Sequence, residues 1–174
     1  MELPYREIPE SPDNYKTGSV LARMIDGLGY RYYWATEGLT EKDLAYLPSA
    51  DGSSTLETLE HIYGLSQAIL EVHQGVNVGS TDRSKLDYQG LRKKTLENLW
   101  EARQLCVDKK AKQIAKMKIV FKRGESTNQF PYWNLLNGQM ADAIYHTGQI
   151  VMMRGTSGNP INPKVKVFMV KNRN

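Results

Sequence analysis

The chain has 174 residues, of which 40% are hydrophobic and 24% are charged, so disorder and a membrane protein are both excluded. No apolar run is long enough to span a bilayer, and "MELPYREIPE" lacks the features of a signal peptide, so we expect a cytoplasmic protein. The formal net charge of +4 is weak support for a nucleic-acid partner. Cys106 is the single cysteine, which excludes an internal disulfide and a multi-thiolate zinc site.

The first half of the chain predicts an arm and two long helices. Residues 1–16 are rich in proline and acidic residues, which is typical of an arm. From Thr17 onward, apolar residues recur at spacings of three and four and define one helical stripe: Leu21, Met24, Leu28, Tyr32 and Ala35. "LTEKDLAYLPS" predicts a short helical turn. Ser54 and Glu57 match a capping box at the start of the second long helix, and Gly75 ends it.

The second half predicts two further helices with a long connection between them. A polar linker leads to a helix over residues 88–117. The connection "MKIVFKRGESTNQFPYW" breaks the helical period and includes a short extended stretch around residues 119–121. The last helix covers residues 133–154, and residues 156–174 form a tail with a short strand at 165–170. Strands are too few to build a sheet, so we expect one all-α domain over residues 1–174, a four-helix bundle.

Three histidines could carry chemistry, and their positions differ. His73 lies at the frayed end of its helix beside Gly75, where a solvated side chain is expected. His61 lies in the body of the same helix, and Gly64 one turn away leaves space beside its imidazole. Taken with this helix alone, His61 is best interpreted as a boundary residue with a hydrogen-bond partner.

The last helix contains an aspartate and a histidine four residues apart. Asp142 and His146 therefore share one helical face, which Gly138 and Gln149 extend. Such a pair can be a surface ion pair, or it can hold one metal ion, as two histidines do in the HExxH arrangement. A third ligand from a facing helix would complete an open three-ligand site, and His61 is the inward-looking candidate.

The segments "TLEHIY" and "YHTGQI" resemble the DinB/YfiT-like family of metal-dependent four-helix bundles. The resemblance implies that His61 and His146 are ligands and that Asp142 occupies a position where the family more often has histidine. It also implies nickel or zinc, a small-molecule substrate and a homodimer. Family members include transferases that use low-molecular-weight thiols, maleylpyruvate isomerases and hydrolase-like enzymes. We therefore expect a metal-dependent transferase or hydrolase.

Four further side chains lie close enough along the helices to orient the ligands: Glu57, Tyr63, Tyr145 and Gln149. Each also has a structural interpretation: the tyrosines as core aromatics, and Glu57 as a residue that serves only its capping box. Gly64, Gly138 and Gly148 could open a substrate pocket above the ion. Two histidines with a carboxylate also match the ligands of non-haem iron oxygenases, so iron and manganese stay open as metals.

Two other interpretations stay open. One is a bundle that binds a metal or small ligand without catalysis. The other is a nucleic-acid-binding module, because "DKKAKQIAKMKIVFKR" concentrates lysines at one helix end, although a solvated face explains them better. The aromatic segment "YRYYWATEGL" supports the homodimer. We expect Trp34, Trp100 and Trp133 to be core residues, and Cys106 to be a buried structural thiol.

Overall fold

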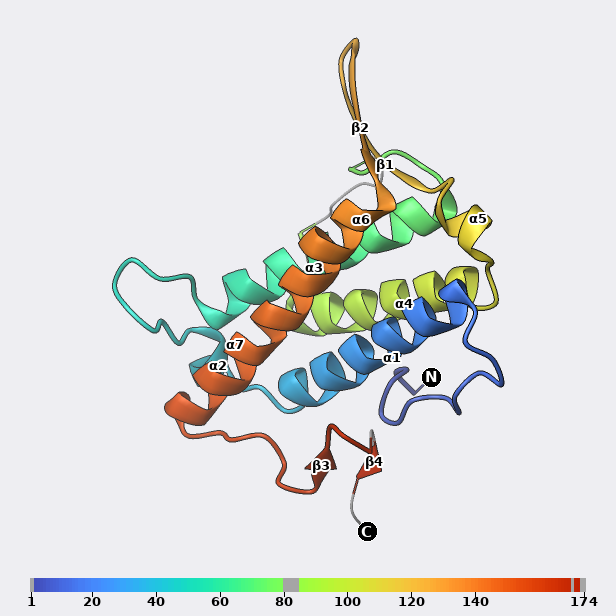
Figure 1. Cartoon of the computed structure of the whole chain (residues 1–174). Helices are drawn as coiled ribbons and strands as arrows, with labels where there is room; N and C mark the ends of the chain where they lie inside the picture. Colours follow the sequence, from blue (N-terminus) through green and yellow to red (C-terminus); the bar gives the residue numbers. More distant parts are fainter. Residues whose placement is uncertain (1, 80–84, 170, 173–174) are drawn as a thin grey trace.

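Four long helices form a bundle, so the predicted all-α architecture is confirmed (Figure 1). The computed structural model describes residues 2–79, 85–169 and 171–172. The third long helix packs between the first and the second, and the fourth contacts the same two helices from the other side, which completes a ring of four. In chain order the long helices are α1 (Thr17–Thr36), α3 (Thr55–Gln74), α4 (Tyr88–Cys106) and α7 (Ala141–Ser157).

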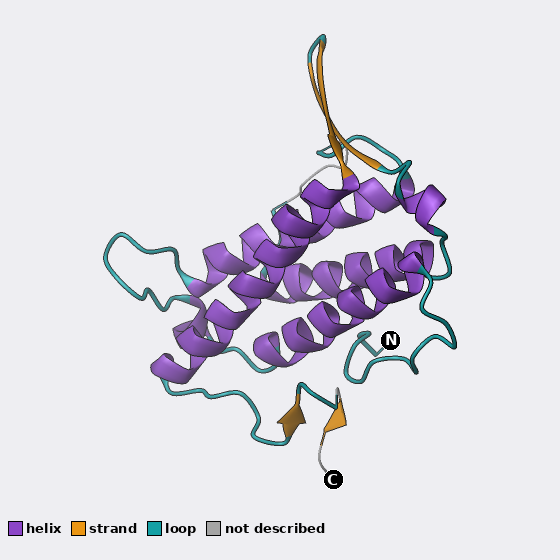
Figure 2. Ribbon diagram, viewed as in Figure 1, coloured by secondary structure: helices purple, strands orange, loops and turns teal. Residues whose placement is uncertain are grey.

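Short elements lie between the long helices and in the tail that follows the last one (Figure 2). They are α2 (Glu41–Leu44), α5 (Ala111–Ile114), β1 (Lys118–Arg123), β2 (Ser126–Pro131), α6 (Tyr132–Leu135), the π-helical turn η1 (Leu136–Met140), β3 (Val165–Lys166) and β4 (Lys171–Asn172). Among the described helices, none combines the length and the apolar character that a membrane span requires.

The connection before the last helix is a β-hairpin, more regular than the short extended stretch that the sequence predicts. β1 pairs antiparallel with β2, and Ile119 lies opposite Phe130. Gly124 turns the chain with a φ of 58°, a conformation that glycine adopts without strain. Ile119 is buried, whereas every residue of β2 is exposed, so the hairpin is anchored at its base and projects from the bundle (Figure 2).

The third long helix is shorter than predicted. It ends at Cys106 rather than near residue 117, and Asp108 has a φ of 64° in the left-handed region. The reason is a contact with the start of α1, where the Gly18 amide donates to the Lys109 carbonyl at 2.8 Å. A Cβ atom at Gly18 would lie only 2.2 Å from the Cys106 carbonyl oxygen. Gly18 is therefore required for close backbone packing.

The aromatic residues of α1 face the core. Tyr30 and Tyr32 are fully buried, and Tyr33 and Trp34 are nearly so. The predicted arm packs against this helix as well, since a Cβ at Gly29 would lie 2.5 Å from the Tyr5 ring. These aromatic residues are therefore buried within a single chain and do not support a dimer interface. The homodimer stays a prediction.

Three residues that the sequence places in the core are exposed or partly exposed in the structure: Met24, Trp100 and Trp133. Met24 is 51% exposed, unlike the other members of the predicted α1 stripe. Trp34 is a core residue as predicted, but Trp100 is partly exposed, with its ring edge-on to Tyr5 at 5.5 Å. Trp133 is 72% exposed, so its assignment to the core is wrong. Its position at the base of the projecting hairpin explains this exposure.

The last helix begins with α6 and continues through the π-helical turn η1 into α7. It ends at Ser157, three residues later than predicted, and Gly158 caps it with a φ of 102°. The predicted strand at residues 165–170 is reduced to two residues that pair with β4, and residue 170 lies outside the described residues. The π-helical turn η1 ends at Met140, two residues before Asp142. Such turns are often found at functional sites, so η1 directs attention to the start of α7.

Candidate metal centre

The structure brings His61, Asp142 and His146 together between α3 and α7. The Nε2 atom of His61 lies 3.1 Å from Oδ2 of Asp142, and Nε2 of His146 lies 3.2 Å from Oδ1. The two imidazole rings are nearly perpendicular, with centroids 4.6 Å apart. One ligand atom from each side chain can be chosen so that all three atoms lie within 4.8 Å of one another. This group could hold a metal ion.

The group lies at the surface and not inside the bundle. The side chain of His61 is 50% exposed, that of Asp142 is 41% exposed and that of His146 is 23% exposed. His61 is therefore not inward-looking, as the sequence led us to expect, because it projects from the flank of α3 toward α7. Water and small molecules can reach such a group directly, which suits a site with open coordination positions.

Gln149 fixes the orientation of the His146 ring. Its Oε1 atom accepts a hydrogen bond from Nδ1 of His146 at 2.6 Å. Nε2 of the same ring faces a carboxylate oxygen of Asp142 at 3.2 Å. In this tautomer the lone pair of Nε2 would be available to a metal ion, and Gln149 would hold the ring in that orientation.

The other candidates for orienting the ligands differ in their contacts. Glu57 is committed to its capping box, where its carboxylate accepts hydrogen bonds from the Ser54 amide and hydroxyl at 2.7 and 2.9 Å. These bonds lower the pKa of Glu57. Tyr63 is buried, whereas His61 is exposed, so the two side chains leave α3 in different directions. Tyr145 is 64% exposed and lies edge-on to His146 at 5.4 Å.

Gly138 and Gly148 are not required for space, because a Cβ atom at either position would meet no neighbouring atom within 4 Å. Gly64 is half-buried on α3. Solvent reaches the triad because its three side chains are themselves exposed or partly exposed.

His73 is buried, so the prediction of a solvated side chain is wrong. Its Nδ1 donates to the Ile69 carbonyl at 2.7 Å, and its Nε2 accepts from the Tyr132 hydroxyl at 3.0 Å. Burial lowers the pKa of His73. Tyr132, at the start of α6, covers the end of α3, which the sequence near His73 does not reveal.

Cys106 is buried beside this cluster, as predicted. Burial raises the pKa of its thiol to about 11, so the thiolate is disfavoured near neutral pH. The thiol donates a hydrogen bond to the Gly18 carbonyl at 3.5 Å. Cys106 is therefore a structural residue and not a nucleophile.

The fold and the surface triad define a class, a four-helix bundle with two histidines and one aspartate on adjacent helices. No protein-family model matches the chain, and no curated protein sequence matches it. A solved structure does match: the crystal structure of the DinB-like protein YjoA from Bacillus subtilis, with a TM-score of 0.58. The two chains are 14% identical, and the match covers 82% of this chain and 95% of YjoA. The chain therefore has a DinB-like fold, which confirms the predicted resemblance at the level of the fold.

Proposed function

We propose that His61, Asp142 and His146 bind one divalent metal ion. The observation that carries this proposal is the proximity of their three ligand atoms, all within 4.8 Å of one another. Ligand atoms that share an ion at bond lengths of about 2.1 Å lie roughly 3 to 4 Å apart. The two short histidine–aspartate distances fall in this range, each to a different carboxylate oxygen of Asp142, and the chosen ligand atoms are at most 4.8 Å apart before an ion draws them together.

The donor set narrows the choice of metal. Two imidazole nitrogens and one carboxylate oxygen suit zinc and nickel, and also accommodate manganese or iron. The thiol of Cys106 is buried elsewhere and does not contribute. Zinc or nickel is our first expectation, because imidazole is a common ligand for both and because the resemblance to the DinB/YfiT-like family implies them.

We infer that the site serves a metal-dependent enzyme, a thiol-dependent transferase or a hydrolase that acts on a small molecule. Three protein ligands leave positions for water or substrate, and a bound divalent ion polarises carbonyl groups and lowers the pKa of water or a thiol. Within the chain, Gln149 holds the ring of His146, and Tyr145 presents an exposed ring beside it. A bundle that binds a metal or small ligand without catalysis is the alternative.

Metal analysis tests the binding step. The protein is purified without immobilised-metal affinity, and its metal content is compared with that of His146→Ala and Asp142→Asn. Asp51→Asn is the matched control, because Asp51 is an exposed aspartate in the loop before α3. We expect about one ion per chain in the wild type and in the control, and loss of the ion in the two ligand variants. Equal metal content in all four proteins would contradict the proposal.

A substrate screen tests the catalytic step. Nickel-, zinc- and manganese-loaded protein is assayed with simple esters and amides, and with electrophilic substrates in the presence of small thiols. We expect at least one activity that His61→Ala and Asp142→Ala abolish. An activity that survives unchanged in both variants rules out the metal as the catalyst. Retention of the ion without any turnover favours the ligand-binding alternative.

A further inference from the structure

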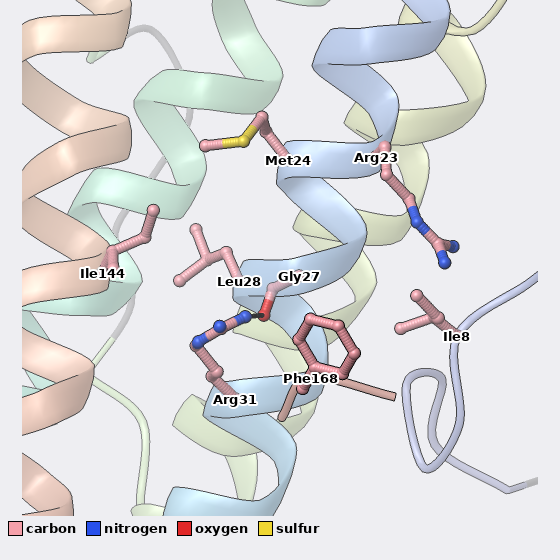
Figure 3. A pocket seen from close by; sticks show the side chains of 8 residues that line it. All are labelled: Ile8, Arg23, Met24, Gly27, Leu28, Arg31, Ile144 and Phe168. Carbon is pink, nitrogen blue, oxygen red and sulfur yellow. Dashed lines mark hydrogen bonds between the residues drawn. The ribbon is translucent and has the colours of Figure 1, made fainter. Parts of the chain in front are cut away.

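A second hollow lies on the other flank of α7. Ile144 follows Asp142 by two residues, so it points about 200° away around the helix. There it lines a groove of about 410 Å³ with residues of α1, the N-terminal arm and the C-terminal tail (Figure 3). Sites for small molecules typically enclose roughly 300 to 1,000 Å³. The groove is therefore large enough for a small ligand and separate from the metal triad.

Most of the groove is apolar. Leu28 of α1 lies between Ile144 and the arm residue Ile8, and the Phe168 ring from the tail lies below it (Figure 3). Phe168 is 92% exposed, an unusual state for a large aromatic side chain in a folded segment. Its neighbours at the tip of the tail, Val167 and Met169, are also exposed. A ligand in the groove would cover part of this apolar surface.

Two half-buried arginines give the groove its charge. Arg23 donates from Nη1 to the Pro9 carbonyl at 2.9 Å, and Arg31 donates from Nη1 to the Gly27 carbonyl at 3.0 Å. These bonds hold each guanidinium in place and leave its other donors available. Among the described residues, no carboxylate lies within ion-pairing distance of either arginine, and no acidic side chain lines the groove.

The buried carboxylate of Asp26 forms no ion pair with either arginine among the described residues. Asp26 is fully buried, and its ion pair is with Arg103 at 3.3 Å, although Arg23 also lowers its pKa. The groove thus combines two fixed positive charges with an apolar wall. Guanidinium groups bind carboxylates through charge-assisted hydrogen bonds, and apolar walls favour a hydrocarbon body.

We propose that this groove binds a small organic carboxylate with an apolar body, such as a medium-chain or aromatic acid. The carboxylate binds one of the two guanidiniums, which Figure 3 shows on opposite sides of the groove, and the apolar body packs against Leu28, Ile144 and Phe168. An inorganic anion would leave the apolar wall exposed, and a neutral lipid would leave the arginines without a counter-charge. This site does not depend on the metal, because none of its residues belongs to the triad.

Decanoate is a suitable probe below its micelle concentration, with decanol as the uncharged comparison. Calorimetry measures affinity, and the methyl resonances of Ile8, Met24 and Ile144 locate the bound molecule. We expect saturable binding of decanoate, weaker binding of decanol, and shifts confined to these methyl groups. At least one of Arg23→Gln and Arg31→Gln should weaken decanoate binding about fivefold or more, the loss expected for a charge-assisted hydrogen bond.

Two variants serve as controls. Arg123→Gln removes an exposed arginine of the hairpin and should leave binding unchanged. His146→Ala should also bind decanoate normally, so failure of the metal site is distinguishable from failure of the groove. Equal affinity for decanol and decanoate, or no effect of the two arginine substitutions, overturns the proposal. A second result would also overturn it: light scattering gives twice the 19.8 kDa chain mass, and decanoate does not shift the methyl resonances of the groove. A second copy of the chain would then cover the groove.

Discussion

Two histidines of the same helix have opposite environments. His61 is half exposed, and its Nε2 lies beside a carboxylate of α7. His73, about three turns further along α3, is 6% exposed, and both its ring nitrogens already have partners within the core. A histidine can bind a metal only through a nitrogen that is free and accessible. The comparison therefore leaves His61 as the candidate ligand of the two and gives His73 a structural role.

The same difference separates two aspartates. Asp142 is 41% exposed, with its two oxygens directed at His61 and His146. Asp26 is fully buried against Arg103, and its second oxygen has no hydrogen-bond partner among the described residues. An accessible polar cluster can exchange its partners for a ligand, whereas a buried one chiefly affects folding. Substitutions of exposed residues such as Asp142 should thus change ligand binding, whereas substitutions of buried residues such as Asp26 should change stability.

Removal of a triad side chain should have the largest effect. His61→Ala, Asp142→Ala and His146→Ala should each weaken the affinity for zinc or nickel by at least about 100-fold, because two ligands hold an ion far less well than three. His73→Gln should leave the affinity unchanged. Competition with a chromogenic chelator measures all four dissociation constants. Comparable losses in His73→Gln and His61→Ala would remove the distinction between the two histidines.

His73→Ala should chiefly reduce stability. The substitution creates a cavity and leaves the buried Tyr132 hydroxyl without its acceptor, so the free energy of unfolding should fall by about 3 kcal/mol. Urea denaturation followed by circular dichroism measures this change. The matched substitution His61→Ala should change stability by less than about 1 kcal/mol, since its side chain is half exposed. An equal loss of unfolding free energy in His61→Ala and His73→Ala would contradict the difference between the two histidines.

Asp26 should make stability depend on pH. Burial raises the pKa of Asp26 to about 6 from 3.8, although Arg103 and Arg23 act against this. The folded chain therefore binds a proton more tightly than the unfolded chain between these pH values. Its contribution is fully present below about pH 4 and is lost as the pH rises through about 6, a change of about 3 kcal/mol in the free energy of unfolding.

Asp26→Asn tests this dependence, because asparagine does not titrate. From pH 7 to pH 4, the unfolding free energy of the wild type should rise relative to that of the variant. Asp142→Asn, measured in metal-free buffer over the same range, is the exposed comparison. A constant difference between wild type and Asp26→Asn would show that Asp26 titrates alike in the folded and unfolded chains.

Gln149 should have the smallest effect on the metal site. Gln149→Leu removes the acceptor for Nδ1 of His146 and should weaken metal binding about tenfold, as loss of a partner that orients a ligand commonly does. Gln149→Glu keeps an acceptor and should restore most of the affinity. If leucine and glutamate bind the ion alike, the hydrogen bond to His146 does not orient the ring.

The sequence predicts features that depend on local patterns. The capping box at Ser54 and Glu57, the apolar periodicity and the four-residue spacing of Asp142 and His146 all involve neighbours along one helix, and the structure contains them. The environment of His73 was not predictable, because it depends on Tyr132, 59 residues away. The close packing of Gly18 against Cys106, 88 residues away, was not predictable for the same reason.

The exposure of the site was also misjudged from the sequence. Helical spacing shows that two ligands share a face, but not whether that face meets the core or the solvent. His61 and Asp142 lie 81 residues apart, and only the packing of α3 against α7 places them at the surface. The groove beside Arg23 and Arg31 likewise needs the arm and the tail, whose positions no local pattern predicts.

Anomalous X-ray diffraction from crystals grown with zinc or nickel tests the central claim most directly. The account predicts one strong peak per chain between α3 and α7, about 2.0 to 2.2 Å from Nε2 of His61, Nε2 of His146 and a carboxylate oxygen of Asp142. At least one further position on the ion should be open to solvent. A fully occupied peak at other residues, or no peak between these side chains at saturating metal, would contradict the assignment.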